Sequence, residues 1–135
     1  MATPDEHPLR LLSAVPQFTV PDVVQTAEYY RDTLGFRVAD YWATPPQFAI
    51  VWRDAVEIFF NKATGGPMRS GRARGAYDAY IRVTDAETLA ADLRTRGADI
   101  IEGPTRRVYD SIEVVVRDCN GLILAFGQDV SPPAA

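Results

Sequence analysis

The sequence predicts an α+β fold made of two successive βαβββ modules. A capped, helix-like segment at residues 22–35 recurs in character at residues 85–97, an offset of 63 residues. One short run with strand character precedes each segment, and three follow it. A length of 135 residues suits one domain, so we expect a single domain over 1–135. Its parts are module one at about 11–61, a connector at 62–75, module two at about 76–128 and a loose tail at 129–135.

The strand runs bracket the two predicted helices in the same order. In module one they are "LLSAVPQFTV" before the helix and "FRVADYW", "QFAIVWR" and "VEIFF" after it. In module two they are "AYDAYIRV" before the helix and "DIIEGPTRRVY", "SIEVVVR" and "LILAFGQ" after it. The intervening "ATPP", Asp54-Ala55 and "DCNG" are typical of turns.

The first helix is predicted by its cap and its apolar spacing. Asp22 is an N-cap residue, and Gln25 completes a capping box. One apolar stripe at helical spacing follows, and Gly35 supplies the residue that ends a helix. The stripe consists of Val23, Ala27, Tyr30 and Leu34.

The second helix repeats this arrangement with different residues. Asp85 is its N-cap, and Gly97 ends it. Arg94 and Arg96 suit the negative C-terminal end of the helix. The apolar stripe consists of Ala86, Leu89, Ala90 and Leu93.

Composition limits the kinds of molecule that the protein is expected to bind. The net charge is −4, with 14 basic and 18 acidic side chains, which disfavours a phosphate backbone and suits a cationic ligand. No apolar run is long enough to span a membrane, and "MATPDEHPLR" lacks the pattern of a signal peptide. The single cysteine, Cys119, fits a reducing compartment. We therefore expect a cytoplasmic protein that binds neither nucleic acid nor membrane.

The arrangement resembles the vicinal oxygen chelate superfamily, which includes glyoxalase I, extradiol dioxygenases and bleomycin resistance proteins. The resemblance covers about residues 11–128 and is carried by the two modules, a "V-x-D" entry to each helix, "YYRDTLGF", and "D-x-N-G" before the last strand. It implies that the strands of the two modules curl into an open barrel-like ligand cavity. It leaves open whether modules pair within one chain or between two.

The resemblance also implies four metal-ligand positions, two of which lack a donor here. They fall on Val15, Glu57, Asp78 and Ala125. Valine and alanine cannot coordinate a cation, and the only histidine, His7, lies in the N-terminal tail. We therefore expect no metal and no other cofactor. Alternatively, Glu57 and Asp78 hold a divalent metal with waters, or pair with a nearby arginine and only stabilise the sheet.

Strand alternation gives the neighbours of these positions. Glu57 shares a face with Phe59, Asp78 with Tyr80 and Arg82, Val15 with Gln17, and Ala125 with Ile123. An apolar and aromatic wall with a few polar groups is typical of a small-molecule pocket. The predicted ligand-binding residues are Gln17, Trp42, Trp52, Glu57, Phe59, Asp78, Tyr80, Ile123 and Ala125.

The run "AVPQFTVPDV" followed by "LGF" is similar to the bleomycin-binding branch of the superfamily. This resemblance implies a homodimer that captures a planar or cationic small molecule without turnover. Tyr80, Phe59, Trp42 and Trp52 would stack on the ligand, and Glu57 and Asp78 would supply charge. Two alternatives remain: a metal-dependent enzyme of the glyoxalase or dioxygenase type that uses Glu57 and Asp78, and a ligand-sensing or dimerisation module.

Overall fold

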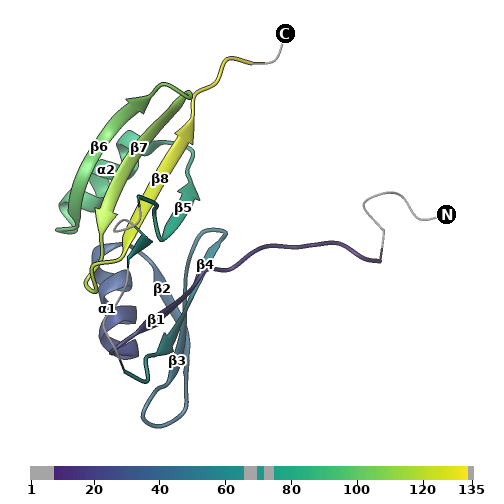
Figure 1. Cartoon of the computed structure of the whole chain (residues 1–135), viewed down its shortest axis with the longest axis vertical. Helices are drawn as coiled ribbons and strands as arrows, with labels where there is room; N and C mark the ends of the chain where they lie inside the picture. The colour runs from purple at the N-terminus through teal and green to yellow at the C-terminus, as the bar shows by residue number, and fades with distance from the viewer. Residues whose placement is uncertain (1–7, 66–69, 72–74, 134–135) are drawn as a thin grey trace.

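The computed structural model describes residues 8–65, 70–71 and 75–133 and contains eight strands and two helices in that part of the chain (Figure 1). Most of the connector's Gly- and Arg-rich stretch and the predicted tail residue His7 lie outside the described residues. The elements are β1 (Gln17–Val20), α1 (Val23–Thr33), β2 (Arg37–Trp42), β3 (Phe48–Arg53), β4 (Val56–Lys62), β5 (Ala79–Arg82), α2 (Ala86–Thr95), β6 (Asp99–Arg107), β7 (Ser111–Arg117) and β8 (Ile123–Asp129).

Each module forms its own four-stranded sheet, which confirms the predicted βαβββ repeat. The strand order is β1-β4-β3-β2 in the first sheet and β5-β8-β7-β6 in the second. In both sheets the strand before the helix lies parallel to the last strand, and the other pairs are antiparallel. The two sheets are not closed into a barrel.

The helices begin and end where the sequence predicts. Asp22 and Asp85 are the N-caps, and their carboxylates accept from the backbone N–H of Gln25 and Thr88 at 2.9 and 3.0 Å. Gly35 and Gly97 follow the helices with φ of +78° and +82°, a region that glycine adopts without strain.

One face of each sheet is covered by the helix of the same module, and the core lies between them. α1 contacts β2, β3 and β4, while α2 contacts β6, β7 and β8. The predicted helical stripes point into this core, and only Leu89 in them is partly rather than fully buried. Buried residues of both modules form one continuous cluster, so the two modules share a hydrophobic core.

Two side-chain hydrogen bonds join α1 to the connection from β7 to β8. The hydroxyl of Tyr30 is buried and donates to Asp118 Oδ2 at 2.7 Å. Asn120 donates to the hydroxyl of Thr26 at 3.0 Å. The "D-x-N-G" turn of module two is thereby bound to the helix of module one.

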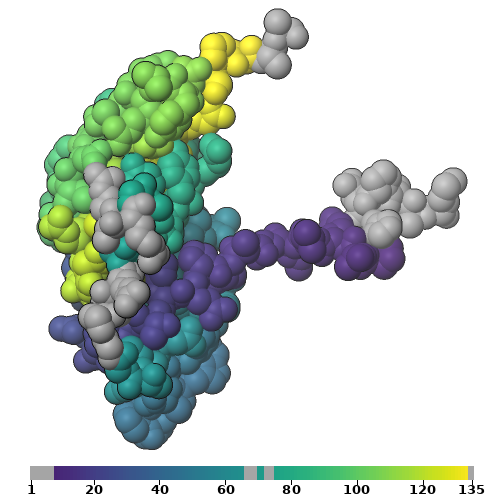
Figure 2. All heavy atoms as spheres, viewed as in Figure 1, coloured from purple at the N-terminus to yellow at the C-terminus, as the bar shows by residue number. Residues whose placement is uncertain are grey.

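The first predicted strand is shorter than its apolar run. Only Gln17–Val20 pairs with β4, while the preceding described residues extend away from the body (Figures 1 and 2). Leu9, Leu11 and Leu12 on this segment are 77%, 98% and 85% exposed. Residues 11–16 of the apolar run therefore pair with no strand among the described residues, and the pattern alone could not determine where pairing begins. Within the described residues, neither helix is long and apolar enough to cross a membrane.

Candidate functional site

The helix-free faces of the two sheets carry most of the residues proposed from the sequence. Because side chains alternate along a strand, residues paired across strands in register share a face. On the first sheet, Trp52 pairs with Glu57 and Ile50 pairs with Phe59. Gln17 pairs with Phe59 and Trp42 with Phe48, so this face brings together Gln17, Trp42, Phe48, Ile50, Trp52, Glu57 and Phe59.

Aromatic rings run across three strands of this face. Trp42 packs edge-on to Phe48 with ring centroids 5.2 Å apart, and Phe48 packs edge-on to Phe59 at 5.4 Å. Trp42 and Trp52 are 44% and 36% exposed. Large exposed rings on one sheet face form a surface on which a planar group can stack. We call Trp42, Phe48, Trp52 and Phe59 the aromatic face.

The polar groups of this face lie at its two ends. Glu57 is exposed and lies beside Trp52 next to the β3–β4 turn. The guanidinium of Arg37 lies 5.4 Å from the centroid of the Trp52 ring. Toward the other end of β4, Gln17 accepts a hydrogen bond from the Asn61 amide at 3.1 Å.

Asp78 is a structural bridge between the connector and the last strand. Its carboxylate accepts from the Ser70 hydroxyl at 2.7 Å and the Gly71 backbone N–H at 2.6 Å. It also accepts from the Ile123 backbone N–H at 2.7 Å. None of these three donors belongs to an arginine. Asp78 therefore stabilises the sheet through backbone and hydroxyl donors.

The residues at the four family positions do not fit a metal ion. Val15 and Ala125 have no donor atom, and both carboxylate oxygens of Asp78 are engaged in hydrogen bonds. Ala125 is buried with Ile123 beneath Tyr77 and Ile101. Across the described ranges, three or more His, Cys, Asp or Glu side chains do not gather into a group that could hold a metal.

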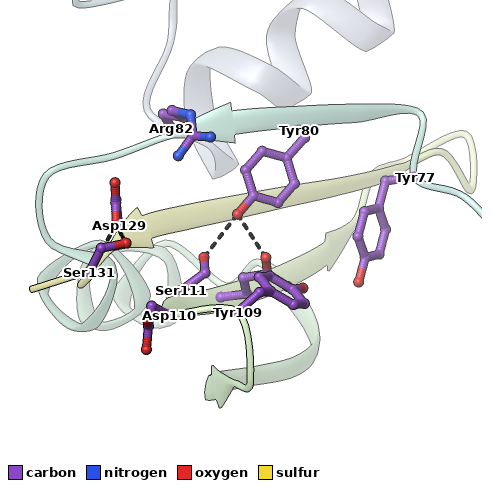
Figure 3. A pocket seen from close by; sticks show the side chains of 9 residues that line it. Tyr77, Tyr80, Arg82, Tyr109, Asp110, Ser111, Asp129 and Ser131 are labelled. Carbon is purple, nitrogen blue, oxygen red and sulfur yellow. Dashed lines mark hydrogen bonds between the residues drawn. The ribbon is translucent and has the colours of Figure 1, made fainter.

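A polar pocket of about 470 Å³ lies on the helix-free face of the second sheet (Figure 3). Strands β5, β7 and β8 and the connection from β6 to β7 supply its walls. Three tyrosines line it together with charged and hydroxyl side chains. The lining residues are Tyr77, Tyr80, Arg82, Tyr109, Asp110, Ser111, Glu113, Asp129 and Ser131.

Glu113 is the centre of a hydrogen-bond network in this pocket. Its side chain is 0% exposed and accepts from the hydroxyls of Tyr80 and Tyr109 at 2.7 and 2.8 Å. The guanidinium of Arg107 donates to it at 3.0 Å and to Glu102 at 2.7 Å. The Tyr80 hydroxyl also lies 2.9 Å from the hydroxyl of Ser111, as Figure 3 shows.

The network keeps Glu113 ionised and its tyrosines neutral. Burial raises the pKa of Glu113, but the bonds from Tyr80, Tyr109 and Arg107 outweigh burial and hold this pKa below its ordinary value. The bond to Glu113 raises the pKa of Tyr109, and desolvation raises that of Tyr80. The pocket therefore presents a paired carboxylate and neutral phenols at neutral pH.

Gly127 makes room for the ring of Tyr80. This glycine lies on β8 opposite Glu113 and Arg82, and a Cβ atom there would collide with the Tyr80 hydroxyl. The absence of a side chain lets Tyr80 lie across β8 and reach Glu113 on β7. Tyr80 is nevertheless 42% exposed, and the guanidinium of Arg82 lies 6.0 Å from the centroid of its ring.

Six of the nine predicted residues lie on two surfaces: Gln17, Trp42, Trp52, Glu57 and Phe59 share the first sheet, and Tyr80 lines the polar pocket of the second. The other three do not line either surface, because Asp78 bridges the connector and β8 and both Ile123 and Ala125 are buried. Sequence reasoning missed Ser111 and Glu113. These residues are two apart on β7, so their side chains lie on the same face of the sheet as Tyr80. A glutamate inside the apolar run "SIEVVVR" was the available signal, because a buried carboxylate needs partners.

The chain belongs to the Glyoxalase/Bleomycin resistance protein/Dioxygenase superfamily, whose family model matches residues 13–126. This range contains both modules and both helix-free faces. No functionally curated protein sequence matches the chain.

Solved structures share the fold at low sequence identity. The chain is similar to TioX from Micromonospora sp. ML1, with 15% identity, a TM-score of 0.69 and coverage of 84% of this chain and 95% of TioX. It is similar to the bleomycin-binding protein of Streptomyces verticillus, solved with copper(II)-bleomycin, at 23% identity and a TM-score of 0.62. That match covers 92% of this chain and 99% of the other. A glyoxalase-related enzyme from Clostridium phytofermentans has 15% identity, a TM-score of 0.69 and coverage of 93% and 100%.

Proposed function

We propose that this protein is a metal-free small-molecule binder that captures a planar or cationic ligand, as bleomycin resistance proteins do. The observation that carries the proposal is the aromatic face, where the indoles of Trp42 and Trp52 are each more than one third exposed and Trp52 lies beside the carboxylate of Glu57. Aromatic rings attract flat rings and cations, and a nearby carboxylate favours positive charge. Capture of this kind needs no reacting group.

The polar pocket extends the proposed binding surface on the second sheet. Asp110, Glu113 and Asp129 give its lining more negative than positive side chains, since Arg82 is the one basic residue among them. Tyr77, Tyr80 and Tyr109 supply ring faces and hydroxyls. These features suit a ligand with a cationic group and several hydrogen-bonding groups. The net charge of −4 adds long-range attraction for such a molecule.

Tryptophan fluorescence during titration with metal-free bleomycin tests the proposal. The only tryptophans, Trp42 and Trp52, both lie on the aromatic face, so a stacked ligand should change the emission. The single variants Trp42→Phe and Trp52→Phe identify which ring responds. Glu57→Gln should weaken binding several-fold, because it removes the charge and keeps the size of the side chain.

Two results would overturn the proposal in different ways. Unchanged emission up to about 100 μM bleomycin would exclude this antibiotic as the ligand. Elemental analysis that finds one tightly held divalent metal per chain, lost in Glu57→Gln, would instead support the metal-dependent enzyme.

A further inference from the structure

A second cavity, of about 620 Å³, lies on the helix-covered side of the molecule, where the two modules meet. Its apolar floor includes Val56, Ile81, Leu89 and Phe126, and Asp54 lies on its rim. Ile81 is adjacent to Tyr80 on β5 and points to the opposite face. The cavity is therefore separate from the polar pocket, although Arg82 contributes to the lining of both.

The two modules differ at the junctions between them, and this difference accounts for the cavity. Both β3 and β7 end in an arginine that is followed by an aspartate, so Asp54 in module one corresponds to Asp118 in module two. The offset of 63 between the caps makes Leu93 of α2 the counterpart of Tyr30 of α1. Each Asp faces the helix of the other module, as Asp118 does with Tyr30 and as Asp54 does by lining the cavity with Leu89.

At the α1 junction the longer turn is bonded to the helix. The connection from β7 to β8 covers residues 118–122 and reaches the helix, where Asp118 accepts from the Tyr30 phenol. At the α2 junction the connection from β3 to β4 covers only residues 54–55, and Leu93 is fully buried and does not line the cavity. Arg53 spans the gap with an ion pair to Asp92 at 3.1 Å. The shorter turn leaves this cavity uncovered, with Asp54 in its lining.

We propose that this cavity is a second binding site, for a small molecule with a phenol group. The ring would lie on the apolar floor, and its hydroxyl would donate to the carboxylate of Asp54, as Tyr30 donates to Asp118. The Asp54 side chain makes no hydrogen bond or ion pair with any other described residue. Asp54, Asp85 and Asp92 outnumber Arg53 and Arg82 in the lining, which favours a neutral hydroxyl donor over an anion. The volume lies within the usual range for small-molecule pockets.

Binding of 2-naphthol, a bicyclic phenol, tests this site separately from the proposed bleomycin-like function. In a ¹⁵N-resolved NMR titration, the amide signals of Val83 and Leu89 should shift, and those of Ser111 and Glu113 should not. Asp54→Gly should weaken binding about tenfold, the usual effect of losing a hydrogen bond to a charged group. Glycine suits this position because Asp54 has a φ of +51°.

Matched tryptophan variants test the location. Thr88→Trp places a ring in the cavity and should weaken 2-naphthol binding at least about tenfold. Gln25→Trp is the control, because Gln25 is the equivalent exposed residue of α1, three after its cap, and should leave the affinity within about twofold. Leu89→Phe is a second blocking variant if Thr88→Trp does not fold. No binding at about 1 mM, shifts confined to the polar pocket, or unchanged affinity in both blocking variants would overturn the proposal.

Discussion

The carboxylate of Glu113 is fully buried, and its ionised form is held by two tyrosines and Arg107. A charge in such a position is stable only while its donors are present. Module two thus depends on a polar network within the face that we propose for binding. The same network fixes Tyr80 and Tyr109 at the edge of the pocket, so stability and ligand contact share residues.

Glu113→Gln should lower the free energy of unfolding by about 1.5–3 kcal/mol at pH 7, because the charged acceptor of three donors is lost. The pKa of Glu113 is lowered in the folded state, so its stabilisation is present above the ordinary value of 4.5 and declines as the pH falls below it. Urea unfolding at pH 7 and at lower pH should therefore show the difference between wild type and variant decreasing in acid. Exposed Glu57→Gln is the control and should unfold like wild type at both pH values.

Gly127→Ala should destabilise the fold by about 1–3 kcal/mol, because the added methyl group collides with the Tyr80 hydroxyl. The cost should fall sharply in a Tyr80→Ala background, where the collision is absent. A double-mutant cycle from chemical denaturation measures this coupling. Additive effects of the two substitutions would show that Tyr80 does not lie over β8.

At the scale of elements, the connection from β7 to β8 binds α1 through buried hydrogen bonds. Burial raises the pKa of Asp118 above its ordinary value, and the bonds from Tyr30, Asn120 and Leu122 offset this effect only in part. The turn therefore depends on a hydroxyl from the other module. Sequence reasoning recognised the helix stripe that contains Tyr30 and the "D-x-N-G" turn, but it had no means of pairing them across 88 residues.

Tyr30→Phe should lower the free energy of unfolding by about 1–3 kcal/mol, since it removes one donor from the buried Asp118 carboxylate. Tyr29→Phe is the matched control. It removes a neighbouring hydroxyl whose bond to the Arg117 carbonyl is exposed and longer, at 3.4 Å, so it should cost much less. Thermal and urea unfolding of the two variants compare the costs directly. Equal costs would contradict a special role for the Tyr30–Asp118 bond.

At the scale of the whole molecule, the sequence predicted the two-module architecture because the signals that begin and end each helix and strand are local. Caps at Asp22 and Asp85, terminating glycines and alternating strands are each specified within a few residues. The polar pocket and the second cavity were not predicted. They depend on Gly127 accommodating Tyr80 and on the unequal lengths of the two turns, which act between strands that are distant in sequence.

The homodimer implied by the family resemblance is a further prediction at this scale. The exposed Leu9, Leu11 and Leu12 and the exposed indoles of the aromatic face give the chain more apolar surface than an isolated domain needs. We expect sedimentation analysis to give twice the chain mass of 14.9 kDa. Replacing Leu11 and Leu12 by serine should shift the population toward monomer. A monomer at all concentrations in the wild-type protein would contradict this prediction.

The two junctions between the modules differ in strength, and this difference has a dynamic consequence. One junction contains the buried Tyr30–Asp118 bond, whereas the other is joined by the partly solvated pair of Arg53 and Asp92, whose side chains are 29% and 34% exposed. Solvated ion pairs contribute little to stability. The two modules should therefore separate first at the Arg53–Asp92 junction, by a rotation about the Tyr30–Asp118 junction. Such a motion would give a small molecule access to the second cavity, while the junction between Tyr30 and Asp118 stays closed.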